Sequence, residues 1–202
     1  CRVTLDRSAL DRTTILSQLM QAIEASLFAQ RERLLDLADD LVQSLVDEHC
    51  PANRAPEDWD IEGLRAQFAR QFGIEATGVD KLVSHDEVAN KLYRDAEAIL
   101  LRKEQEFGVD QYLRLFRNFY LQEIDRQWIE HLQSMEHLRD GIGLRGYGQR
   151  DPKKEYKREG YELFVQMTQS VRASVGYNMF HVERLAEEDV VRLEAQRRKQ
   201  AE

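Results

Sequence analysis

The sequence has few of the residues that cross-link a fold or interrupt its helices. Among 202 residues there are two cysteines and three prolines, which excludes a disulfide framework and disfavours a turn-rich sheet architecture. Neither Cys1 nor Cys50 has a second Cys or a His at metal-ligand spacing, so we expect Cys50 to be a free thiol. The content of 42% apolar and 33% charged residues is typical of a folded chain whose helices have solvated faces. We therefore predict an all-α fold.

Long apolar runs are also missing. No stretch of about 18 apolar residues occurs, and the first thirty positions lack the basic, apolar and small segments of a signal peptide. We expect a cytoplasmic chain, or one that binds a membrane only peripherally. The formal net charge of −8 argues against a general nucleic-acid-binding protein, because phosphate binding needs a positive field. The first residue is Cys rather than Met, which suggests part of a longer protein.

Recognisable catalytic motifs are absent as well. No Gly-rich loop is followed by Lys and Ser or Thr, so the chain cannot hold a nucleotide in the P-loop manner. His131 and His137 lie six positions apart, on different faces of a helix, and no Glu-x-x-His pattern accompanies them. We expect no catalytic residue, no metal site and no cofactor in this chain.

Helical spacing of apolar residues recurs along the whole sequence. It predicts helices over about residues 13–49, 59–72, 85–107, 110–140 and 152–192. Gly73 is expected at the C-terminal end of the second helix. Ser84 with Glu87 predicts a capping box for the third helix, and Asp110 can cap the fourth.

The last two predicted helices match in length and in the width of their apolar stripes, which predicts a long antiparallel hairpin. The first of them would be about 45 Å long. Trp128 could bind a ligand, but its position on the apolar stripe favours a packing role. The residues that we expect to pack within the hairpin are Ile124, Trp128, Met135, Phe164 and Met167.

The connection between these helices, residues 140–151, is the least ordinary stretch of the sequence. Four glycines alternate there with large apolar and cationic side chains, whereas helix connections are usually short and polar. One interpretation is an exposed contact surface for an extended or variable partner; the other is that the apolar side chains fold back and cap the hairpin. The lysines that follow the connection could bind a partner, but a solvated helix face is favoured. The candidate contact residues are Ile142, Leu144, Arg145, Tyr147 and Gln149.

Two strings in the hairpin carry a resemblance to a known family. LQEIDRQWIEHL at 121–132 and MEHLRDGIGLRGYGQRDPKKEYKRE at 135–159 resemble the SecA family of bacterial preprotein-translocase ATPases. EDWDIEGL at 57–64 is similar to the helical wing of that family. The resemblance covers about residues 41–185, and the stretch before residue 40 lacks the acidic segment that leads into this region in the family.

The resemblance implies a domain organisation and a mode of action. Residues 1–49 would be an N-terminal helical segment, 50–108 a smaller helical wing, and 109–202 the helical scaffold's two-helix finger with a charged tail. In the family the finger loop enters the cytoplasmic mouth of the SecYEG channel and contacts the moving polypeptide. Here Leu144, Arg145, Gly146 and Tyr147 match that loop, and Trp128 and His131 would belong to the first helix of the finger.

The implied partners are the SecYEG channel, unfolded preproteins, the motor domains of the full-length protein, SecB and a second copy in a homodimer. ATP and Mg²⁺ are expected only in the motor domains, which these residues do not include. The implied location is peripheral, on the cytoplasmic face of the inner membrane. The chain would be either a C-terminal piece of such an ATPase or a homologue reduced to scaffold and wing. A competing hypothesis is a stand-alone helical interaction module, an adaptor or chaperone-like protein without a motor.

Overall fold

The computed structural model describes residues 12–143 and 151–184, with side chains from residue 24 onward. These ranges contain helices and no strand, which confirms the all-α prediction. The elements in chain order are α1 (Arg12–His49), η1 (Pro56–Asp58), α2 (Ile61–Phe72), η2 (Val79–Lys81), α3 (His85–Phe107), α4 (Val109–Ile142) and α5 (Pro152–His181), where η marks a short 3-10 helix.

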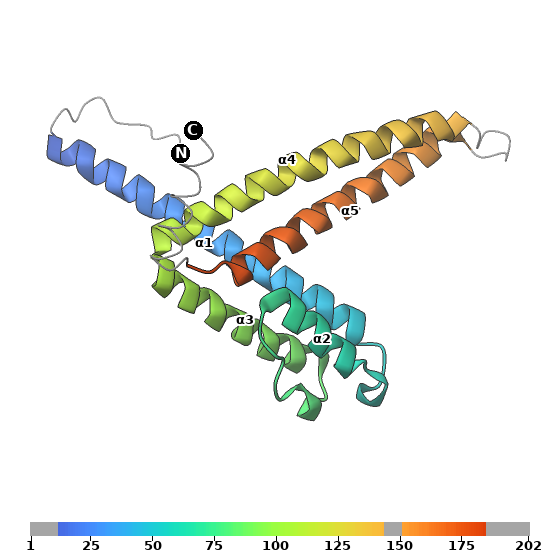
Figure 1. Cartoon of the computed structure of the whole chain (residues 1–202), viewed down its shortest axis with the longest axis horizontal. Coiled ribbons are helices and arrows are strands. Elements are labelled where there is room, and N and C mark those ends of the chain that lie inside the picture. The colour runs from blue at the N-terminus through green and yellow to red at the C-terminus, as the bar shows by residue number, and fades with distance from the viewer. Residues whose placement is uncertain (1–11, 144–150, 185–202) are drawn as a thin grey trace, which may run out of the picture.

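The long hairpin projects from the other helices (Figure 1). α4 and α5 lie side by side and antiparallel, while α1 crosses near their roots and packs with α2 and α3. With 34 residues, α4 is about 51 Å long at 1.5 Å per residue. We call residues 117–143 and 151–170, the outer parts of α4 and α5, the arm. We call α1 from Leu34 onward, α2, α3 and the roots of α4 and α5 (109–116 and 171–184) the base.

The hydrophobic core lies in the base. Its fully buried side chains come from every long helix: Leu34, Val42 and Val46 of α1, Leu64, Phe68 and Phe72 of α2, Leu92 and Leu100 of α3, Tyr112 and Leu113 of α4, and Met179 of α5. None of the described arm residues reaches this degree of burial. The arm is therefore held by its root and by the contact between its own two helices.

Local sequence signals explain most helix ends. Gly73 ends α2 with φ of 73°, a left-handed conformation that glycine adopts at little cost. Gly108, with φ of 79°, is the only residue between α3 and α4. Asp151 caps α5 by accepting from the backbone N–H of Lys153, and Pro152 occupies the first helical turn.

Three local predictions are wrong. Ser84 precedes α3, but its side chain makes no capping hydrogen bond, so the predicted capping box does not form. Asp110 does not cap α4, because α4 already begins at Val109, and its carboxylate pairs with Arg114 one turn later. α5 ends at His181 and not near residue 192, since Val182, with ψ of 129°, is already outside the helical conformation.

The three predicted segments share one core, because buried residues of α1, α2, α3, α4 and α5 form a single cluster. The proposed division at residues 49 and 108 coincides with helix ends. Whether any segment folds separately stays a prediction.

Candidate functional site

The last residues of α4 and the first residues of α5 lie together at the end of the arm far from the base (Figure 1). Ile142 is the last residue of α4 and is half-buried. Leu144, Arg145, Tyr147 and Gln149 lie outside the described residues. The choice between a contact surface and a folded-back cap therefore stays open for these four side chains.

The side of the arm displays aromatic residues from both helices. Trp128 lies 5.4 Å from His131 between ring centroids, and His131 lies 6.0 Å from Phe164 on the facing helix. Trp128 and Phe164 are each 44% exposed, and Ile124 is 40% exposed. A hairpin of two helices covers only the sides that face each other, so these residues are half in contact and half on the surface.

The other two predicted packing residues lie deeper. Met135 and Met167 are half-buried. A Cβ atom added to Gly160 of α5 would come within 2.9 Å of the Met135 methyl group. The glycine thus lets the two helices approach closely near the end of the arm, and the flexible methionine fills the remaining space.

A shallow hollow of about 350 Å³ lies on the arm beside these aromatic residues. Its lining comes from both arm helices and includes Tyr120, Trp128, Phe164 and Met167. The lining is mainly apolar, which suits contact with apolar side chains better than binding of a charged small molecule.

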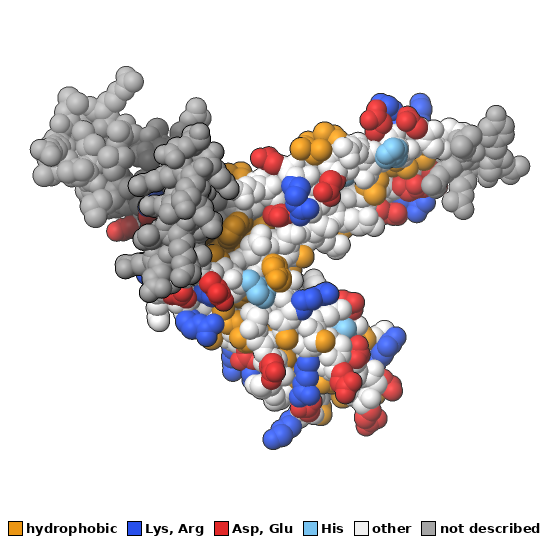
Figure 2. All heavy atoms as spheres, viewed as in Figure 1, with side chains coloured by type: hydrophobic (Ala, Val, Ile, Leu, Met, Phe, Trp, Pro, Cys, Tyr) orange, Lys and Arg blue, Asp and Glu red, His pale blue; other side chains and the backbone are white. Residues whose placement is uncertain are grey.

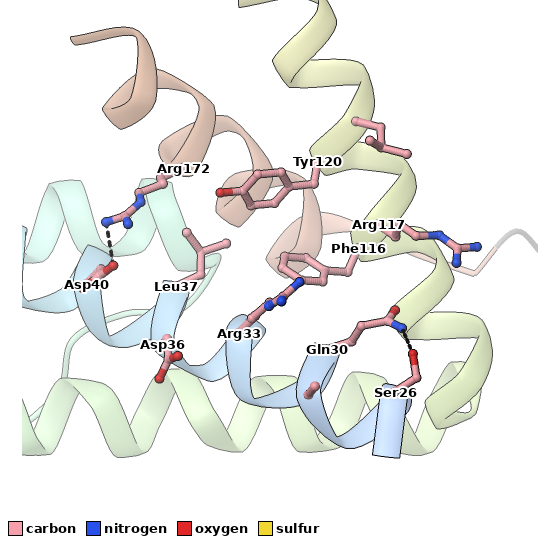
Figure 3. Close-up of a pocket in the computed structure, with 12 residues that line it drawn as sticks. Ser26, Gln30, Arg33, Asp36, Leu37, Asp40, Phe116, Arg117, Tyr120 and Arg172 are labelled. Atoms are coloured by element: carbon pink, nitrogen blue, oxygen red, sulfur yellow. Dashed lines mark hydrogen bonds and ion pairs between the residues drawn. The ribbon is translucent and has the colours of Figure 1, made fainter. Parts of the chain in front are cut away.

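A larger cleft of about 850 Å³ separates α1 from the root of the arm. In Figure 3, Leu37 of α1 and Phe116 and Tyr120 of α4 point toward one another across it. At one side Arg172 of α5 donates to Asp40 of α1 at 2.6 Å (Figure 3). No local sequence pattern predicts this cleft, because its lining comes from α1, α4 and α5, which are far apart in sequence.

The outward surface of α4 is unusually apolar for a helix that lies so far from the core. Leu121, Ile129 and Leu132 are each more than half exposed. Figure 2 shows hydrophobic side chains among charged ones along the arm. Apolar side chains that gather on one element mark a contact surface more often than scattered ones do.

Groups suited to covalent or metal chemistry do not converge in the part of the chain described here. No set of three His, Cys, Asp or Glu side chains there could hold a metal ion. Cys50 is free and buried. Its burial raises the pKa of its thiol, and the negative charge of Asp60 nearby raises it further to a smaller extent. A protonated, buried thiol is a weak nucleophile. The described helices also include none that is long and apolar enough to cross a membrane.

Comparisons with known proteins find one family model and several curated relatives that share one name. The family model described as "SecA Wing and Scaffold domain" matches residues 8–183. A protein translocase subunit SecA of Sorangium cellulosum (strain So ce56) is 42% identical over 196 residues, which cover 96% of this chain and 19% of the relative. The SecA subunit of Anaeromyxobacter sp. (strain Fw109-5) is 44% identical over 177 residues, covering 83% of this chain and 18% of the relative.

A third relative has a similar identity and a similar share of matched residues. The SecA subunit of Myxococcus xanthus (strain DK1622) is 40% identical over 153 residues, covering 76% of this chain and 16% of the relative. The chain thus spans about a fifth of the length of the curated relatives it matches, or slightly less.

Proposed function

The chain belongs to the family of SecA wing and scaffold domains, and on this premise we propose that it is the part of a protein translocase that presents the tip of the arm to a moving polypeptide. The observation that carries the proposal is the family match over residues 8–183, which includes the whole arm and its connection. The relatives are named protein translocase subunits.

The arm supports this role physically. A helical hairpin rooted in a buried core can hold its end at a fixed distance from the base. In the proposal, the connection after Ile142, with Leu144, Arg145, Tyr147 and Gln149, contacts both the unfolded preprotein and the cytoplasmic mouth of the SecYEG channel. Aromatic and aliphatic side chains suit this task because they contact many sequences without demanding a particular one.

The driving energy would come from outside this chain. ATP and Mg²⁺ would bind motor domains of the full-length protein, and the motion of those domains would reach the tip through α1 and the base. The location that fits this proposal is the cytoplasmic face of the inner membrane, where the protein is peripheral. SecB and a second copy of the protein remain proposed partners of the full-length protein.

A chimera tests the proposal. Residues 8–183 of this chain replace the matching segment of the SecA subunit from Sorangium cellulosum, and transport of a preprotein into membrane vesicles with SecYEG is measured. We expect transport that depends on ATP. A matched chimera in which Leu144, Arg145 and Tyr147 are changed to Ser should fold equally well and transport much less.

Two outcomes would contradict the proposal. A chimera that folds and hydrolyses ATP but moves no preprotein would show that these residues do not serve translocation. Full transport by the triple-Ser chimera would show that the tip is not the contact surface. Binding of a protein partner by the isolated chain without any transport in the chimera would favour the adaptor hypothesis.

A further inference from the structure

The C-terminal end of α5 is held by side chains of two other helices. The last carbonyl groups of a helix have no partner within the helix. Here the carbonyl oxygen of Met179 accepts a hydrogen bond from the Tyr112 hydroxyl at 2.9 Å. The carbonyl oxygen of Val182 accepts one from Lys103 Nζ at 2.6 Å. Donors from α3 and α4 thus fix the point at which the arm returns to the base.

Both donors are buried. Tyr112 is fully buried and Lys103 is only 7% exposed, which is rare for lysine. The ammonium lies at the end of α5 where the helix dipole is negative, and this favours a positive charge there. Burial, with smaller effects from the charges of Glu104 and Glu106, raises the pKa of Tyr112, so its hydroxyl keeps the proton that it donates.

Glu104, which follows Lys103 in α3, connects this helix to α1. Nε of Arg31 lies 3.0 Å and 3.2 Å from the two carboxylate oxygens of Glu104, and Glu104 is 9% exposed. Gly108 follows one turn later and is the only residue between α3 and α4. The last turn of α3 is therefore the place where α1, α4 and α5 are joined.

A polar contact that joins α1 directly to the root of α5 is weaker. The side chains of Arg172 and Asp40 are each 51% exposed, and exposed ion pairs contribute little because water screens them. A hydrogen bond from a buried charged donor to a partly buried carbonyl contributes more, and removing that donor leaves the carbonyl without the bond.

We infer that Lys103 is the positioning residue that sets the direction of the arm relative to α3, with Tyr112 as the second donor. The inference deepens the proposed function and rests on it, because the direction of the arm decides where the tip meets a polypeptide. Lys103 itself touches no partner in this account. It acts through the end of α5.

Double electron–electron resonance on this chain tests the inference. Spin labels are placed at Gln133 on the arm and Arg94 on α3, in a background with Cys1→Ser and Cys50→Ala. We expect Lys103→Met to broaden and shift the distance distribution at temperatures where the variant is fully folded. Lys91→Met is the matched control, because Lys91 lies on the same helix and pairs with Asp95 one turn later on that helix, so it should leave the distance distribution unchanged.

Hydrogen exchange gives a second measurement of the same change. In Lys103→Met the backbone amides of Met179 to Val182 should exchange on the order of tenfold faster, as expected for loss of a hydrogen bond to a charged donor. Lys103→Arg, which keeps a cationic donor, should restore both the distance distribution and the slow exchange. If Lys103→Met does not fold, Tyr112→Phe removes the neighbouring donor alone and should shift the distribution in the same direction.

A variant that is destabilised elsewhere shows whether a change in the direction of the arm is distinct from a general loss of stability. Leu92→Ala removes a fully buried side chain of α3 and should lower the melting temperature without moving the arm. The inference is overturned if Lys103→Met lowers the melting temperature but leaves the distance distribution unchanged, or if Leu92→Ala shifts it as much. Neither measurement involves transport, so failure here leaves the translocation proposal standing, and failure of the chimera leaves this test intact.

Discussion

The base and the arm contain similar apolar residues but bury them very differently. In the base, Phe68 stacks on Phe72 at 4.5 Å and Phe72 meets Phe180 edge-on at 4.6 Å, with all three buried. In the arm, Trp128 and Phe164 remain almost half exposed. The difference shows that the apolar stripe of a helix predicts contact, while the number of neighbouring helices decides how much of the stripe is buried.

Polar interactions differ between the two regions in the same way. In the base, Gln71 of α2 donates to the carbonyl oxygen of Ala173 in α5 at 2.9 Å, a bond that joins distant parts of the chain. In the arm, Arg126 and Arg158 pair with glutamates three or four positions away on their own helices. Such local pairs support a single helix and do not fix it against another.

The largest expected difference in stability comes from the same Phe→Ala substitution made once in the base and once in the arm. Phe68→Ala in the base should reduce the free energy of unfolding by about 3–5 kcal/mol, because it leaves a cavity in the core. Phe164→Ala on the arm should cost less than about 1.5 kcal/mol, since much of that ring already contacts water. Urea denaturation followed by circular dichroism measures both. Equal losses would mean that the arm shares the stability of the core.

Two glycines of α5 give a second, smaller contrast. A Cβ at Gly176 would lie 2.3 Å from the Leu41 side chain and 3.2 Å from the Gln71 amide. Gly176→Ala should therefore destabilise the base by about 1–3 kcal/mol.

The matched change on the arm should behave differently. At Gly160 the nearest atom is the end of a flexible methionine, and alanine gains about 0.5–1 kcal/mol in helix propensity. Gly160→Ala should change the unfolding free energy little. A loss as large as that of Gly176→Ala would show that the arm helices are packed as rigidly as the base.

The smallest expected effect is a pH dependence located in the base. His85 lies 2.8 Å from Asp47 of α1 and 3.2 Å from Asp86. Burial lowers the pKa of His85, but the hydrogen bonds to Asp86 and Asp47 outweigh this and raise it above its ordinary value. The contribution to stability is therefore fully present below pH 6.5 and is lost as the pH rises through the higher folded-state value.

Because both carboxylates are largely exposed, the contribution should be less than about 1 kcal/mol. Thermal unfolding between pH 5.5 and 8.5, compared with His85→Gln, measures it as a pH-dependent difference that is larger at low pH. A difference that grows toward high pH would contradict the assigned hydrogen bonds.

The sequence predicts the helices well because their apolar periodicity is a local property. The end of α2 at Gly73 and the start of α5 at Pro152 were both predicted from residues with strong backbone preferences. Two caps were predicted wrongly for different reasons. Ser84 does precede α3 but its side chain makes no capping hydrogen bond, and α4 begins at Val109, one residue before Asp110. Local pattern fixes neither the orientation of a capping side chain nor the exact first residue of a helix.

The candidate site was less accessible to sequence reasoning. The periodicity placed Trp128 and Phe164 on facing stripes, but it could not show that no third helix covers them in the described part of the chain. The cleft between α1 and α4 depends on the crossing of helices far apart in sequence. The end of α5 accepts a hydrogen bond from Lys103, a buried residue whose charge alone would place it on the surface.

The most direct test of the account is photo-cross-linking from a probe at Tyr147 in the chimera, during transport of a stalled preprotein. The account predicts adducts between the probe and both the preprotein and the cytoplasmic loops of the channel, and none from a matched probe at Arg102 on the exposed side of α3. Adducts from neither position, or equal adducts from both, would contradict the claim that the base holds the tip of the arm against a moving polypeptide.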